Sequence, residues 1–242
     1  PNLEKLQGGR ILVELPGIKE KERVEDLLKS TAMLEFWEVY TNYQGNQNVT
    51  AALFNNAAKS AAKNAATSAD SALLSDMMSK AVGADGLAIG YFTEADTAAI
   101  GKVLPAITEN FEADDVVFYW GISDKNKNNA YPLIPLKKAS ENIGAVLNGK
   151  TINGQRIVRN ARQNVDEHNH VIVSMSMEDA AAKEWQRITA DAIKKRNETN
   201  IPTNIAIVLD QIVYSYPTIQ SEIANGESQI SGNFSVDEAK DL

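Results

Sequence analysis

The sequence predicts an α+β fold, in which a ferredoxin-like base of two split βαβ units carries a large inserted head domain of mixed α/β structure. A strand–helix–strand pattern near the amino terminus and a second one near the carboxyl terminus predict the base. The stretch between them differs in composition and is rich in alanine, which predicts the insertion. We therefore divide the 242 residues into a base (1–43 and 166–242) and a head (44–165).

The first βαβ unit begins with a short alternating run. Residues 11–15 alternate between two faces in the manner of a strand, and Pro16 and Gly17 end it. The charged residues 19–29 carry apolar side chains at helical spacing, and residues 34–39 alternate again. This order predicts strand, helix and strand.

The carboxyl-terminal zone repeats this pattern. Residues 171–177 alternate, and residues 205–209 and 212–219 form two further apolar strands. The helix between the first two strands has a stripe of side chains at buried spacing: Ala181, Trp185, Ile188 and Ala192. Trp185 is therefore predicted to lie in a core.

The middle zone is predicted to carry its own core. Its alanine-rich stretch 51–79 favours a helix, and residues 94–110 predict another. Residues 88–92 and 116–120 read as strands, and residues 131–136 are extended because two prolines deny the segment ladder donors.

Composition excludes several classes of protein. The net charge of −8 and the pI near 4.9 argue against sequence-independent binding to nucleic acid, which needs dense Lys and Arg. There is no cysteine, so neither disulfides nor thiolate metal sites are possible. No apolar run is long enough to span a bilayer. Because the sequence opens at Pro1 without Met, we expect it to be a piece of a larger protein.

Catalytic motifs are missing from the sequence. His168 and His170, with Asp166, are the one group that resembles a divalent-metal site, and an exposed loop is the simpler interpretation. There is no nucleophile elbow and no phosphate-binding loop. We expect a non-enzymatic module without a cofactor, a bound metal or a small-molecule substrate.

The two ends of the chain resemble a known family. The first matching stretch runs Gly8-Gly9-Arg10-Ile11-Leu12-Val13-Glu14-Leu15-Pro16-Gly17 and continues, after a charged helix, with Thr31-Ala32-Met33-Leu34-Glu35-Phe36. The second comprises Leu209-Asp210, Val213, Ser215, Pro217, Ile219, Ile223, Gly226, Gln229-Ile230, Gly232, Phe234, Glu238-Ala239 and Leu242. In order and spacing these positions resemble the first extracytoplasmic domain of SecD-type protein-export subunits, over about half of the chain.

One position departs from the family pattern. SecD proteins usually have Asp-Gly at the hairpin where this chain has Asp210-Gln211. Glycine tolerates the positive φ of a tight turn and glutamine does so less easily, so we expect a different turn type or a longer loop.

The resemblance implies a function in protein export. SecD, alone or fused to SecF, lies beside the SecYEG channel in the bacterial inner membrane and belongs to the RND superfamily. Its domain on the periplasmic side is expected to bind the emerging unfolded preprotein, and proton flow through the membrane part to drive translocation. The implied partners are the preprotein, SecF and SecYEG, and no nucleic acid.

Candidate functional residues follow from this interpretation. A surface that grips many unrelated chains needs adaptable apolar side chains, and the head offers Met77, Met78, Tyr91, Phe92, Tyr119 and Trp120. The two chain crossings between base and head supply the candidate hinge residues Gly45, Asn46, Asn164 and Asp166.

Three other functions remain open from the sequence. The first alternative is a periplasmic ligand-binding domain of another RND-superfamily transporter. The second is a metal-dependent enzyme centred on His168 and His170. The third is a regulatory ligand-binding module of ferredoxin-like fold, which fold analogy alone supports.

Overall fold

The chain divides into two compact units, residues 1–32 and 33–242. The computed structural model describes residues 2–5, 11–14, 34–64, 72, 75–76, 86–113, 115–138, 144, 147–148, 151–152 and 155–232. In the first unit β1 (Asn2–Lys5) pairs antiparallel with β2 (Ile11–Glu14), the first strand that the sequence predicts. The predicted helix 19–29 lies outside the described residues.

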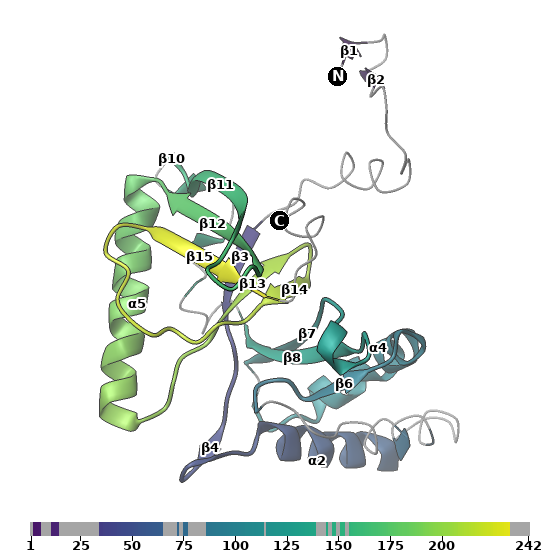
Figure 1. Cartoon of the computed structure of the whole chain (residues 1–242). Helices are drawn as coiled ribbons and strands as arrows, with labels where there is room; N and C mark the ends of the chain where they lie inside the picture. Colours follow the sequence, from purple (N-terminus) through teal and green to yellow (C-terminus); the bar gives the residue numbers. More distant parts are fainter. Residues whose placement is uncertain are drawn as a thin grey trace. The chain divides into compact units, whose positions relative to one another are not determined.

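Six strands of the second unit form one continuous sheet (Figure 1). Their order is β3 (Leu34–Glu38), β13 (Ile205–Leu209), β14 (Ile212–Ser215), β7 (Val116–Gly121), β8 (Tyr131–Lys137) and β6 (Gly90–Phe92). All neighbours are antiparallel except β14 and β7, which are parallel. This parallel step joins strands of the predicted base to strands of the predicted head in a single sheet.

A second sheet consists of β11 (Val158–Val165), β12 (Val171–Met177) and β15 (Glu227–Ser231), all antiparallel. Helix α5 (Asp179–Thr199) therefore connects strands of two different sheets, because β12 lies in this one and β13 in the other. The α+β class is confirmed, but this pairing differs from the predicted ferredoxin-like base, in which both strands share a sheet. Antiparallel neighbours occupy both edges of β12, so no edge is left for β13.

Two helices accompany the half of the large sheet that contains β6, β7 and β8. Helix α2 (Thr50–Lys63) overlaps the first part of the predicted alanine-rich helix 51–79 and buries Phe54, Ala58 and Ala61 on one face. Helix α4 (Glu94–Glu109) matches the predicted helix 94–110. The remaining short elements are β4 (Tyr43–Gln44), β5 (Gln47–Asn48), η1 (Lys125–Lys127), β9 (Thr151–Ile152) and β10 (Gln155–Arg156).

The hairpin between β13 and β14 corrects one expectation. Leu209 pairs with Ile212, so the turn has only two residues, and both Asp210 (φ 49°) and Gln211 (φ 66°) adopt the left-handed conformation. A different turn type or a longer loop was therefore the wrong prediction. Turns with two positive φ values match the twist of the flanking strands. The cost of about 1–3 kcal/mol per strained residue is offset by burial of the strands that the turn connects.

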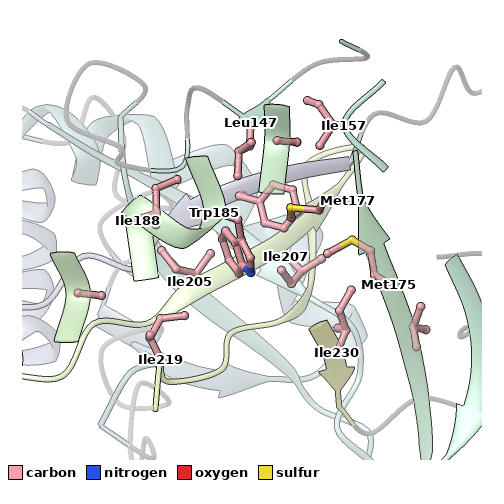
Figure 2. Packing of buried hydrophobic residues seen from close by; sticks show 14 residues of the cluster. Leu147, Ile157, Met175, Met177, Trp185, Ile188, Ile205, Ile207, Ile219 and Ile230 are labelled. Carbon is pink, nitrogen blue, oxygen red and sulfur yellow. The ribbon is translucent and has the colours of Figure 1, made fainter. Parts of the chain in front are cut away.

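Two clusters of buried side chains pack on one face of the six-stranded sheet. The first, the α5 core, joins Phe36, Ile205 and Ile207 of this sheet to α5 and to the three-stranded sheet (Figure 2). The predicted stripe of α5 is buried in it, including Trp185 at 4% exposure. The second, the aromatic core, joins α2 and α4 to β6, β7 and β8. Alternate residues such as Trp37 and Val208 belong to a third cluster on the opposite face.

Candidate binding site

An apolar cavity of about 200 Å³ lies in the α5 core, between the two sheets. The six-stranded sheet contributes Phe36, Ile205 and Ile207, and the three-stranded sheet contributes Met175 and Ile230. Figure 2 shows Met175, Ile205, Ile207 and Ile230 in the same cluster as the indole of Trp185. The segment 217–223, which follows β14, forms the remaining wall. The cavity therefore lies where two sheets, a helix and a loop meet.

The mouth of the cavity is polar, whereas its walls are apolar. Gln220, Ser221 and Gln229 line it and are exposed, while Pro217 and Ile223 are half-buried. A pocket that holds a complete small molecule has a volume of roughly 300–1,000 Å³. This smaller cavity suits one apolar side chain, whose backbone stays at the polar mouth.

Hydrogen bonds hold the walls in place. The indole N–H of Trp185 donates to Ser228 Oγ at 2.9 Å, and the rings of Phe36 and Trp185 lie 5.2 Å apart. The backbone N–H of Ile223 donates to Thr189 Oγ1 at 3.0 Å, which ties the loop to α5. Since Ser228 satisfies the one polar group of the indole, the cavity wall is preorganised as an apolar surface.

The two histidines lie in the turn of the β11–β12 hairpin. Asp166 Oδ2 lies 3.1 Å from His170 Nδ1, and the imidazole rings of His168 and His170 stack 6.0 Å apart. The backbone N–H of His170 donates to the Asp166 carboxylate, and this hydrogen bond lowers the pKa of Asp166 below its ordinary value. In the part of the chain that the structure describes, no three His, Cys, Asp or Glu side chains form a group that could hold a metal ion.

The candidate contact residues of the sequence analysis do not form one patch. Phe92 is buried at 1% exposure and packs edge-to-face on Trp120 in the aromatic core. Tyr91 and Tyr119 lie on the opposite face of the sheet and are half-buried. Burial, followed by the charge of Glu35, raises the pKa of Tyr119. Met77 and Met78 lie outside the described residues.

The candidate hinge residues all lie in or beside hairpin turns. Gly45 (φ 61°) and Asn46 form the turn between β4 and β5. Asn164 pairs with Ile172 within the β11–β12 ladder, and Asp166 begins the turn that closes it. Because β11 and β12 are neighbours in one sheet, Asn164 and Asp166 lie at a hairpin of the three-stranded sheet, and their role as hinge residues stays a prediction.

Sequence reasoning missed the cavity. Its lining residues are spread along the chain between Phe36 and Ile230, and no local pattern indicates that these side chains meet. One signal was present: residues 212–219 alternate as if in a single strand, yet β14 ends at Ser215. The remaining apolar residues of that run then form the loop that borders the cavity.

Two family models match the ends of the chain. The model described as the N-terminal part of the P1 domain of the protein translocase subunit SecDF matches residues 1–41, and the SecDF P1 head subdomain matches residues 133–242. The chain belongs to the SecD/SecDF P1 family. Its cavity combines the two matched ranges, because Phe36 lies in the first and the other lining residues lie in the second.

Curated relatives agree with this assignment. The chain is 30% identical to the protein translocase subunit SecD of Rhodothermus marinus, over all of this chain and 40% of that protein. It is 29% identical to SecD of Magnetococcus marinus, over all of this chain and 31% of that protein. The chain thus spans less than half the length of these relatives.

A solved structure of SecDF, described as a membrane component that enhances protein export, matches all of this chain and 74% of its own. Its TM-score is 0.43, at 20% identity. SecD is a translocase subunit, so the P1 chain belongs to a transport protein and not to a catalytic enzyme, as the sequence indicated. In the described part of the chain no helix is both long and apolar enough to cross a membrane.

The matched head range and the predicted domain division overlap only in part. Residues 133–242 include the segment 166–242, which the sequence analysis assigned to the base, and exclude most of 44–165. The candidate contact residues between Met77 and Trp120 precede the matched range, whereas the cavity mouth at 217–229 lies within it.

Proposed function

We propose that this P1 domain binds unfolded preprotein on the periplasmic side of the bacterial inner membrane and thereby assists translocation driven by the proton motive force. SecF and the SecYEG channel are its proposed partners. The observation that carries this proposal is the cavity at Trp185, whose apolar walls open to a polar mouth. A site that accepts one apolar side chain at a time suits a substrate whose sequence varies.

The chemistry of the cavity fits an unfolded chain better than a compact ligand. Leu, Ile, Val and Phe recur in every secretory polypeptide, and burying one such side chain contributes about 1.5–3 kcal/mol. Gln220, Ser221 and Gln229 at the mouth offer hydrogen-bonding groups to the backbone on either side. Met175 in the wall has a flexible thioether that adapts to side chains of different shape.

Binding of a single apolar side chain is weak, and weak binding is compatible with the proposed function. One buried side chain corresponds to a dissociation constant above 1 mM, because about 4 kcal/mol separates 1 M from 1 mM and the burial contributes only about 1.5–3 kcal/mol. A polypeptide that leaves an adjacent channel is held at high local concentration, which compensates for the low affinity. Weak binding also permits release as the chain advances.

A second proposed contact surface comprises the exposed parts of Tyr91 and Tyr119, which lie on the same face of the sheet. The contact roles of Trp120, Met77 and Met78 stay predictions. Tyr91 lines a separate hollow of about 300 Å³ with Pro132 and Tyr216. Phe92 is better explained as part of the aromatic core, because its side chain is buried. Hinge motion at Gly45, Asn46, Asn164 and Asp166 stays a prediction.

In-cell photocrosslinking tests the proposal. A photoreactive amino acid is placed singly at Gln220 and Gln229 at the cavity mouth, at Tyr91 and Tyr119 on the second surface, and at Lys59 on the exposed face of α2 as a control. The full-length membrane protein is used while a secretory protein is stalled in mid-export. We expect adducts with the stalled chain at Gln220 and Gln229 and none at Lys59.

A cavity-filling variant makes the test specific. Ile223→Phe places a larger side chain at the half-buried edge of the cavity. We expect it to abolish the adducts at Gln229 while the protein stays folded, with a melting temperature lower by several degrees, because overpacking of this size typically costs about 1–3 kcal/mol. Absence of adducts at every mouth position, in cells that export normally, would contradict preprotein binding at the cavity.

A further inference from the structure

We infer that the outer edge of β11 docks an extended polypeptide segment, which adds a strand to the three-stranded sheet. This surface lies across β12 from β15 and the cavity. The identity of the segment, an unfolded chain in transit, depends on the proposed function. The geometry of the edge does not depend on it.

The strand is long, exposed and at the end of its sheet. The order β11-β12-β15 leaves β11 at the edge (Figure 1), and its eight residues make it the longest strand of the described chain. Residues 159–162, 164 and 165 are exposed. Among the residues that the structure describes, no strand pairs with the outer side of β11. An edge of this kind is a template for pairing with another chain.

The register shows which backbone groups point outward. The N–H of Asp166 donates to the carbonyl oxygen of His170 at 2.9 Å, which fixes the phase of the ladder. Hydrogen-bonded and non-hydrogen-bonded pairs alternate in antiparallel strands, so Asn164 and Arg162 bond to β12. Ala161 and Gln163, the residues in between, therefore direct their N–H and C=O groups away from the sheet.

The surroundings of Val165 agree with this alternation of inward and outward backbone groups. Its N–H donates to the side-chain oxygen of its neighbour Asn164 at 2.9 Å, as expected for an amide that no strand engages. Its side chain is 51% exposed, one of two large apolar side chains with such exposure in the described chain. An apolar side chain on an added strand would cover Val165 and extend the apolar surface that starts at Val171.

The usual protection of edge strands is weak here. Natural edges carry lysine, proline or inward-pointing charge, which discourage pairing. From Asn160 to Val165 the sequence has no lysine and no proline. The one bulge of the ladder lies at its start, between Val158 and Asn160. The outer edge beyond this bulge is regular enough to accept a partner strand.

The charges of the edge identify the occupant. Arg159 is held by Glu178 and Asp179 at 3.2 and 2.7 Å, whereas Arg162 lines a shallow polar hollow and has no ion pair among the described residues. Two copies of β11 paired edge to edge about Arg162 would place the two Arg162 side chains directly opposite each other, which is unfavourable. The edge thus selects an extended segment of another polypeptide with neutral or acidic side chains.

Hydrogen exchange measured by NMR on the full chain tests this inference. The probe is the peptide Ser-Val-Thr-Asp-Thr-Val-Ser. We expect the amides of Ala161 and Gln163 to exchange rapidly in the free protein and to become protected when the peptide is added. The amides of Arg162 and Asn164, which already bond to β12, should be slow in both states. Protection that appears without peptide and rises with protein concentration would overturn the inference in favour of self-pairing.

A variant that removes one outward donor makes the test independent of exchange rates. Ala161→Pro deletes an N–H that β12 does not use, and proline is tolerated at an edge. We expect the peptide to bind about five-fold more weakly, the effect of losing one hydrogen bond. Ala161→Ser keeps the N–H and should bind as the natural chain does. Equal affinity of the Ala161→Pro variant and the natural chain, with the ladder amides of Arg162 and Asn164 still protected, would overturn the inference.

The experiments can contradict either proposal without contradicting the other. Crosslinks at Gln220 and Gln229 without peptide protection at Ala161 and Gln163 would leave the cavity function intact and remove the docking edge. Protection at the β11 edge without crosslinks at the cavity mouth would support the edge and remove the cavity as the preprotein site.

Discussion

The α5 core and the aromatic core cover the same face of one sheet, yet they are built differently. In the aromatic core the rings form a connected network: Phe118 packs edge-to-face on Phe54 at 5.1 Å and on Phe111 at 5.5 Å. In the α5 core most side chains are aliphatic, and Phe36 and Trp185 make one aromatic contact at 5.2 Å. The α5 core alone surrounds the cavity described above.

The difference indicates that the two cores on this sheet have different roles. Interlocking rings leave little room for rearrangement, because each ring is fixed by its neighbours. Aliphatic side chains beside a cavity can adjust to an incoming group. We interpret the aromatic core as the rigid support and the α5 core as the part that accommodates a ligand. Four predictions run from the largest expected effect to the smallest, and the first two test this contrast directly.

Truncating a ring of the aromatic core should have the largest effect. Phe118 is 7% exposed and contacts two other rings. Phe118→Ala should lower the free energy of unfolding by about 3–5 kcal/mol, because the neighbouring rings cannot close the void. Urea denaturation measures the loss. Phe118→Leu is the control and should cost less, and equal losses for both variants would show that the ring network is not what stabilises this core.

A matched pair of isoleucines compares the two cores directly. Ile100 is buried in the aromatic core and Ile207 lines the cavity. Each change to alanine falls in the range of about 2–5 kcal/mol, and the loss should be larger at Ile100. The reason is that Ile207 already faces empty space and has fewer contacts to lose. A larger loss at Ile207→Ala in the same urea titration would contradict the contrast.

An ion pair connects the two halves of the sheet. The carboxylate of Glu38 is nearly buried and lies 3.0 Å from Lys137 Nζ on β8 and 3.2 Å from Lys195 Nζ on α5. Glu38→Gln leaves two ammonium groups close together without the carboxylate, and we expect a loss of about 1–3 kcal/mol in the free energy of unfolding.

The matched control removes one cation. Lys195 is half exposed, so Lys195→Met should cost less than about 1 kcal/mol. Thermal melts of both variants in low and high salt compare the contribution of the Glu38 carboxylate with that of the Lys195 ammonium group. If the Lys195→Met loss equals the Glu38→Gln loss, the carboxylate would not be the centre of the contact.

The smallest effect concerns the turn of the β11–β12 hairpin. The hydrogen bond from the N–H of His170 lowers the pKa of Asp166 in the folded chain. Its contribution to stability is therefore present above the unfolded pKa of about 3.9 and is lost as the pH falls through the lower folded value. The melting temperature of the natural chain should exceed that of Asp166→Asn near neutral pH, and the difference should shrink in strong acid. A difference that is constant across this range would contradict the assignment.

Local sequence patterns predicted where several strands and helices lie and which of the two each segment forms. The alternation of residues 34–39, 171–177 and 205–209 gave the strands β3, β12 and β13, and the stripe on α5 gave its buried face. These predictions succeed because period-2 and period-3.6 spacing reflect which side of an element is buried. The strand β11 was missed, since its polar residues have no buried face and therefore no apolar alternation.

The amino-acid sequence by itself determined the α+β class, the burial of Trp185, and the membership of the SecD family, because each depends on residue type and local spacing. Only the tertiary structure decided which strands share a sheet and where the cavity lies. A strand can pair with several others, and the pairing that forms depends on hydrogen bonds and packing over the whole chain. The same applies to the turn at Asp210 and Gln211, where burial of the adjoining strands overrides the local preference of glutamine.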